Sequence, residues 1–130
     1  MTPEFAKKKV LVVEDDERIL ETLKDVFLLG GYDVQIAVNG VEGKKIFVEY
    51  RPDIVISDIV MPDMDGIEMV QEIRRIQSDI KVIYTTAWFQ REDIAKRLNE
   101  ELRRHPDYRL MKKPFKIENV WKMTEQYLAE

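Results

Sequence analysis

The stretch Ile54-Val55-Ile56-Ser57-Asp58-Ile59-Val60-Met61-Pro62-Asp63-Met64-Asp65-Gly66 predicts a strand, an acidic residue at its end and the entry to a helix. The strand is expected over Asp53–Ser57, and its run of apolar residues is typical of a strand covered on both faces. After Gly66, apolar residues recur at helical spacing at Met69, Val70, Ile73 and Ile76. Asp65-Gly66 is therefore expected to lead into a helix, and Asp58 to lie just beyond the carboxyl end of a buried strand.

The same alternation of strand and helix extends in both directions along the chain. Four further strands are expected at Val10–Val13, Val34–Ala37, Val82–Tyr84 and Tyr108–Lys112. Helical faces follow at Ile19–Phe27, Ile46–Tyr50, Ile94–Leu102 and Ile117–Leu128, and Asn39 is a candidate cap for the second. The first, third and fourth strands are apolar throughout, whereas the second and fifth alternate with polar residues, as edge strands often do. The pattern predicts an α/β fold, a doubly wound parallel sheet in the order 2-1-3-4-5 with helices on both faces.

Length and composition favour one soluble domain. The chain has 130 residues, of which 45% are hydrophobic and 35% charged, and it has no cysteine. Residues 1–7 are interpreted as an N-terminal tail or a cloning remnant, and residues 8–130 as the domain. A net charge of −4 argues against direct binding of nucleic acid by this domain. The apolar runs are too short to span a membrane, and together these features predict a cytoplasmic location.

Polar residues follow four strands that are neighbours in the predicted order. They are Glu14 and Asp15 after the first strand, Asp58 after the third, Thr86 after the fourth and Lys113 after the fifth. Ligands bind at this edge of such sheets, so these side chains are expected to converge. Crowded carboxylates are relieved by a hard divalent cation, and Mg²⁺ suits a small, partly hydrated site. A carboxylate there can attack phosphorus to form an acyl phosphate, while Lys113 and a threonine hydroxyl bind phosphoryl oxygens.

These motifs, in this order, resemble the receiver domain of bacterial two-component systems from about Lys9 to Leu128. The shared motifs are Glu14-Asp15, Asp58 with Pro62 and Asp65-Gly66, Thr86-Ala87, and Lys113-Pro114-Phe115. The resemblance implies a flavodoxin-like (βα)5 fold and a cis peptide bond before Pro114. Within the family the chain looks most like the single-domain sporulation phosphorelay regulators, with Gly31-Tyr32 before the second strand and Gly66-Ile67-Glu68 opening the third helix.

The resemblance also implies a role for each matched residue. Asp58 would accept a phosphoryl group from a sensor histidine kinase or a histidine phosphotransfer protein. Asp15 and Asp58 would bind Mg²⁺ through carboxylates, Val60 through its backbone carbonyl and Glu14 through a water. Thr86 and Lys113 would contact the phosphoryl group. The surface of the fourth helix, fifth strand and fifth helix would then change and engage a downstream protein or a fused output domain. The domain would not be a metabolic enzyme.

Some positions depart from the family pattern. Leu110 stands where many receivers have an aromatic switch residue, and Tyr108, on the same strand face, is a possible substitute. Val60 and Trp88 border the expected route of hydrolytic water and are apolar, which predicts a long-lived acyl phosphate. Four more residues than usual separate Thr86 from Lys113. The charged residues between Arg91 and Arg104 are expected to form a solvated helix face.

Three alternatives compete with this interpretation. Asp63, Asp65, Gly66 and Glu72 match positions of a calcium-binding loop, but Met61 occupies its first position and a strand precedes it. A phosphatase of the haloacid dehalogenase type would need a second aspartate at Val60. A receiver-like module that takes no phosphate is conceivable because of Leu110. The sequence leaves open whether the domain stands alone or belongs to a larger regulator or hybrid kinase.

Overall fold

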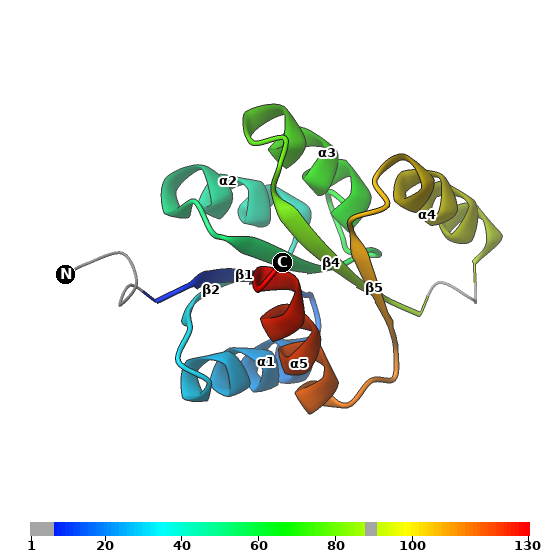
Figure 1. The fold of residues 1–130 in the computed structure, drawn as a ribbon. Helices are drawn as coiled ribbons and strands as arrows, with labels where there is room; N and C mark the ends of the chain where they lie inside the picture. Colours follow the sequence, from blue (N-terminus) through cyan, green and yellow to red (C-terminus); the bar gives the residue numbers. More distant parts are fainter. Residues whose placement is uncertain (1–6, 88–90) are drawn as a thin grey trace.

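The computed structural model describes residues 7–87 and 91–130. Strands and helices alternate along the chain, as the sequence predicts (Figure 1). The strands are β1 (Lys9–Val13), β2 (Asp33–Ala37), β3 (Ile54–Asp58), β4 (Lys81–Thr86) and β5 (Arg109–Lys112). The helices are α1 (Glu17–Leu29), α2 (Gly40–Tyr50), α3 (Gly66–Ile76), α4 (Glu92–Arg104) and α5 (Ile117–Leu128).

The strands form one parallel sheet in the order β2-β1-β3-β4-β5, which confirms the predicted topology. The central strand β3 is buried at every position, whereas the edge strand β5 is buried at none. Apolar runs therefore occupy the middle of the sheet, where helices cover both faces. In this register Asp58 lies opposite Thr85, and Thr86 lies opposite Lys112.

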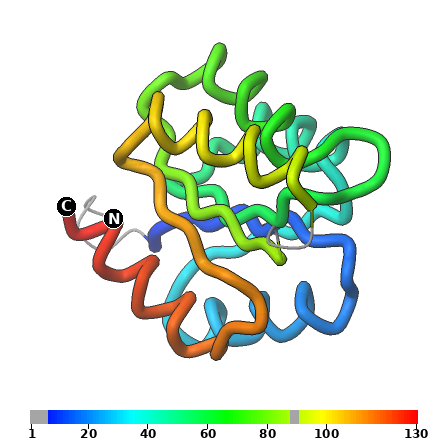
Figure 2. Tube along the Cα trace, turned by 90° about the vertical axis from the view of Figure 1, so that its right-hand side faces the viewer, coloured from blue at the N-terminus to red at the C-terminus, as the bar shows by residue number. Residues whose placement is uncertain are grey.

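Helices cover the sheet as two layers, with α2, α3 and α4 on one face and α1 and α5 on the other (Figures 1 and 2). Each layer closes its own apolar core. The first contains Phe47, Val70, Ile73, Ile94 and Leu98, and the second contains Leu20, Leu23, Phe27, Val120 and Tyr127. The two cores hold the strands rigidly, which fixes the positions of the strand-end side chains.

The starts of the helices differ in their capping, and α5, like α4, begins at a cation, Lys116, without a side-chain capping bond. The side chains of Asp16, Asn39 and Asp65 each accept a hydrogen bond from a backbone N–H in the first turn of α1, α2 and α3, which confirms the expectation for Asn39. Among the described residues, α4 begins without such a bond, because Arg91 occupies the capping position. The starts of α4 and α5 are therefore less conventional than those of the other three helices.

The loop between β3 and α3 is tightly folded beside Asp58. The N–H of Gly66 donates to the carbonyl of Ile59 over 2.8 Å. A Cβ on Gly66 would lie 2.1 Å from the carbonyl oxygen of Asp58, so glycine is required there. Asp63 adopts a left-handed conformation with φ of 70°. These features turn the chain sharply from the end of β3 into α3.

Four sequence predictions need correction. β4 runs from Lys81 to Thr86, so Thr86 is the last residue of that strand instead of following it. β3 runs one residue further than expected, so Asp58 is its last residue, and Tyr108 precedes β5. The charged face of α4 is not wholly solvated, because Glu101 is only 4% exposed. Glu101 follows Ile94 and Leu98 at helical spacing, so it belongs to the buried stripe of the helix.

Within the described parts of the chain, no helix is long and apolar enough to cross a membrane.

Candidate functional site

Asp58 is held at the carboxyl end of β3 by its own backbone surroundings. Its side chain is nearly buried, and its Oδ1 accepts a 2.7 Å hydrogen bond from the N–H of Ile59. The hydroxyl of Ser57 donates to the carbonyl of Asp58 over 2.7 Å. One carboxylate oxygen is therefore fixed, while Oδ2 points to the neighbouring charged groups.

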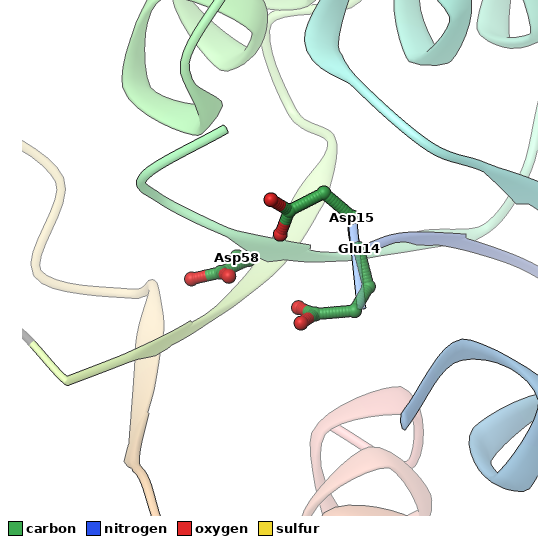
Figure 3. A group of neighbouring side chains, drawn as sticks. All are labelled: Glu14, Asp15 and Asp58. Atoms are coloured by element: carbon green, nitrogen blue, oxygen red, sulfur yellow. The ribbon is translucent and has the colours of Figure 1, made fainter. Parts of the chain in front are cut away.

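Glu14, Asp15 and Asp58 form an acidic cluster at this edge of the sheet. One carboxylate oxygen from each lies within 4.8 Å of the others, and Figure 3 shows the three side chains gathered beside the end of β3. Glu14 is buried, and its N–H donates to the carbonyl of Ala37, whereas Asp15 is exposed. A cluster of hard oxygen donors with one solvent-facing member fits Mg²⁺, which keeps part of its hydration shell in proteins.

Lys113 links two of these carboxylates. Its Nζ donates to Oε1 of Glu14 over 2.9 Å and to Oδ2 of Asp58 over 3.0 Å. The N–H of Lys113 donates to the carbonyl of Thr86 over 2.8 Å, which ties the end of β4 to the loop after β5. The peptide bond between Lys113 and Pro114 is cis, as the sequence predicts.

Crowding changes the pKa values of the buried charged groups. Burial raises the pKa of Glu14 to about 7, and the nearby charge of Asp58 adds to the increase while Lys113 partly offsets it. Burial alone would lower the pKa of Lys113, but the charge of Asp58 and the hydrogen bond to Glu14 raise it overall. Lys113 is therefore a permanent cation, whereas Glu14 exchanges its proton near neutral pH.

A cavity of about 190 Å³ lies beside Asp58. Thr86, Lys113 and Val60 line it together with Asp58, so the structure brings these predicted site residues to one place. The Val60 side chain is 43% exposed at the cavity edge. Arg91 and Ile94 of the α4 region complete the lining, and nothing in the sequence pattern marked Arg91 as a site residue.

This geometry agrees with the comparison to known proteins. The family model described as the response regulator receiver domain matches residues 10–125. The chain belongs to this receiver-domain family. Receiver domains of two-component response regulators are phosphoacceptors, and that is the function of the family to which this chain belongs.

Individual relatives agree with this assignment. The receiver domain is 40% identical over 121 residues to a probable C4-dicarboxylate response regulator, DctR, of Bacillus subtilis, covering 92% of this chain and 51% of the relative. It is 32% identical over 112 residues to the response regulator MprA of a Mycobacterium species, covering 86% of this chain and 46% of that protein. The chain thus spans about half the length of these curated relatives. A CheY-like receiver domain from Methanospirillum hungatei superposes with a TM-score of 0.82 at 25% identity, covering 95% of both chains.

The predicted switch and access residues of the receiver domain fall in different places. Leu110 is half-buried and packs against the core beneath α2, α3 and α4. Tyr108 is buried, and its ring contacts those of Tyr84 and His105. Trp88 lies outside the described residues. Leu110 and Tyr108 therefore both face the side of the sheet that α4 covers, and they lie two residues apart along the chain.

Sequence reasoning missed a buried polar network in the receiver domain. Arg74 of α3 donates to both carboxylate oxygens of Glu101 on α4, over 3.0 and 3.3 Å, and to the hydroxyl of Tyr108 over 3.0 Å. The hydroxyl of Tyr84 donates to Glu101 over 2.7 Å. Only the helical spacing of Glu101 after Leu98 signalled it, because its charge suggested solvent. This network joins α3 and α4 to β4 and to the start of β5.

The calcium-loop alternative conflicts with the contacts of its own acidic residues. Asp65 caps α3 and accepts two hydrogen bonds from Arg97, at 2.8 and 3.3 Å. Glu72 lies on α3 and accepts a 2.5 Å bond from Lys44 of α2. These carboxylates are bound to separate cations instead of surrounding a common point, so we reject a calcium loop here.

Proposed function

We propose that Asp58 is the phosphoryl acceptor of this receiver domain. The observation that carries the proposal is the position of its carboxylate, at the end of β3, bonded to Lys113 and beside a cavity shared with Thr86. Attack by Oδ2 forms its bond to phosphorus as the bond from phosphorus to the donor breaks, and the donor leaves with that electron pair. Oδ1 stays bonded to the N–H of Ile59, whereas the Lys113 ammonium on Oδ2 would transfer to the phosphoryl oxygens as the new bond forms.

The neighbouring residues bind the phosphoryl group and the metal ion. Lys113, held beside both Asp58 and Glu14, pairs with the phosphoryl oxygens, and the Thr86 hydroxyl hydrogen-bonds another. Asp15, Asp58 and the backbone carbonyl of Val60 would hold Mg²⁺ directly, and Glu14 through a water. When bound, Mg²⁺ offsets the negative charge of the phosphoryl group and polarises it.

The proposal extends to partners and output. The donor is a sensor histidine kinase or a histidine phosphotransfer protein in the cytoplasm. Phosphorylation changes the surface formed by α4, β5 and α5, and that surface engages a downstream protein or a fused output domain.

Incubation with Mg²⁺ and acetyl phosphate, followed by intact-mass measurement, tests the proposal. We expect one phosphoryl group on the parent protein and none on Asp58→Asn. Asp63→Asn is the matched control, because Asp63 is an exposed loop aspartate whose left-handed backbone asparagine tolerates. Label that persists in Asp58→Asn, or a parent that never becomes labelled, would contradict the assignment.

A further inference from the structure

Arg91 faces the phosphoryl-acceptor cavity from the α4 side. It lines the same cavity of about 190 Å³ as Asp58, Thr86 and Lys113. Among the described residues that line this cavity, Arg91 and Lys113 are the cations. A guanidinium has five N–H donors in a planar fork that matches phosphoryl oxygens. The cavity therefore contains a second phosphoryl-binding side chain by chemistry as well as by position.

The present partner of Arg91 holds it only weakly. Its Nη2 lies 3.0 Å from Oδ2 of Asp93, and its Nε lies 3.4 Å from Oδ1. The two side chains are 54% and 64% exposed, and ion pairs this exposed contribute little to stability. The guanidinium can therefore leave Asp93 for a more highly charged partner at low energetic cost.

The position of Arg91 is also unfavourable for the helix that it precedes. Capping positions favour serine, threonine, aspartate or asparagine, and a cation there faces the positive end of the helix dipole. Within the described chain, the Arg91 side chain makes no capping hydrogen bond to α4.

The negative charge at the cavity leaves a role for a cation in addition to Lys113 and a bound Mg²⁺. Lys113 is already shared between the carboxylates of Glu14 and Asp58, and Asp15 adds a third negative group nearby. An incoming phosphoryl group adds further negative charge on the α4 side of Asp58. Arg91 lines the cavity that this group would enter.

We propose that Arg91 is a phosphoryl-binding residue, whose guanidinium exchanges Asp93 for the oxygens of the phosphoryl group being transferred. The inference rests on the proposed role of Asp58 as acceptor. Arg91 neither gains nor loses a proton. The bond from Asp58 to phosphorus forms as the bond from phosphorus to the donor breaks. The guanidinium only donates hydrogen bonds to the phosphoryl oxygens during the transfer. Asp93 thereby competes with the phosphoryl group for Arg91.

Labelling rates with acetyl phosphate and Mg²⁺ test this exchange, because substituting Arg91 and substituting Asp93 should change the labelling rate in opposite directions. Arg91→Ala is expected to label about tenfold more slowly than the parent, the size of one charge-assisted hydrogen bond, and Arg91→Lys to recover part of the rate. Asp93→Asn frees Arg91 and is expected to label about twofold faster. Raising the salt concentration should slow the parent more than Arg91→Ala. Arg103→Ala is the control, because the Arg103 side chain is 77% exposed at the other end of α4.

The outcomes separate this inference from the assignment of Asp58. If the parent labels at Asp58 and Arg91→Ala labels equally fast, the inference fails while the acceptor stands. Slowing of both Arg91→Ala and Asp93→Asn, with unchanged salt dependence, would indicate damage to the start of α4 and also overturn it. A parent that does not label at all defeats both. Opposite effects of the two variants, with equal final labelling, support the exchange.

Discussion

At the residue scale, protonation of Glu14 makes the stability of the protein depend on pH. Its pKa is raised from the ordinary 4.5 to about 7 in the folded protein. In the metal-free protein, the stabilising effect of protonated Glu14 is complete below about 4.5 and is lost as the pH rises through about 7. A divalent cation favours the deprotonated carboxylate and so opposes this loss.

We therefore predict that Mg²⁺ stabilises the protein more at higher pH. The increase in free energy of unfolding on adding Mg²⁺ should be larger by roughly 1–2 kcal/mol at about pH 8 than at about pH 6. Thermal denaturation with and without Mg²⁺ measures it. Glu14→Gln should remove most of the difference, whereas Glu17→Gln, an exposed glutamate on α1, should retain it. Equal stabilisation at both pH values would contradict the role of Glu14.

We also predict, at the residue scale, that Val60 prolongs the lifetime of the acyl phosphate on Asp58. Its apolar, partly exposed side chain lies at the cavity edge and cannot hydrogen-bond a hydrolytic water. Val60→Asn supplies a donor and an acceptor there, so we predict dephosphorylation about tenfold faster. The decay of labelled protein, followed by intact mass, measures the rate. Val48→Asn is a matched control, because Val48 is similarly exposed (45%) but lies on α2. If the acyl phosphate of the parent decays as fast as that of Val60→Asn, Val60 does not prolong its lifetime.

At the element scale, α4 is attached to α3 by two charged contacts. Arg97 bonds Asp65, the residue that caps α3 after the Asp58 loop, and Arg74 bonds the buried Glu101. Burial alone would lower the pKa of Arg74, but its bonds to Glu101 and Tyr108 raise it well above the ordinary value. Burial, followed by the charge of Glu101, raises the pKa of Tyr84. At neutral pH Arg74 is therefore charged and Tyr84 remains a hydrogen-bond donor.

Removing the charge of Glu101 should loosen this attachment. We predict that Glu101→Gln lowers the free energy of unfolding by about 3 kcal/mol, because it leaves Arg74 largely buried without its counter-charge. Chemical denaturation measures the change. The double variant Arg74→Met with Glu101→Gln should lose less than the sum of the single losses. Glu100→Gln, at an exposed neighbouring position, should change stability by less than about 0.5 kcal/mol; an equally small effect at Glu101 would refute the network's importance.

At the scale of the whole molecule, sequence patterns predicted the sheet order and most of the site. Apolar strands lie in the centre of the sheet, and the positions of Asp58, Thr86 and Lys113 at strand ends were sufficient to bring them together. Glu101 could not be placed from its residue type, because its burial depends on partners from two other elements, Arg74 of α3 and Tyr84 of β4. Arg91 was missed for a related reason: only the packing of α4 across the sheet edge shows that it reaches the cavity of Asp58.

The signalling pathway to which the domain belongs stays a prediction. The likeness to single-domain sporulation regulators rests on two short motifs, Gly31-Tyr32 and Gly66-Ile67-Glu68. Gly66 is explained by its close approach to the backbone of Asp58, which any receiver with this loop shape would require. That motif therefore reports the geometry of the site more directly than the identity of the pathway.

The most direct test of Asp58 as the acceptor is to identify the residue that bears the phosphoryl group. Borohydride reduces an acyl phosphate to an alcohol, so a phosphorylated aspartate becomes homoserine, which peptide mass spectrometry locates. After reaction with acetyl phosphate and Mg²⁺, we expect homoserine at position 58 and unmodified residues at positions 14 and 15. Homoserine at position 15, or phosphorylated protein that yields no homoserine at position 58, would contradict it.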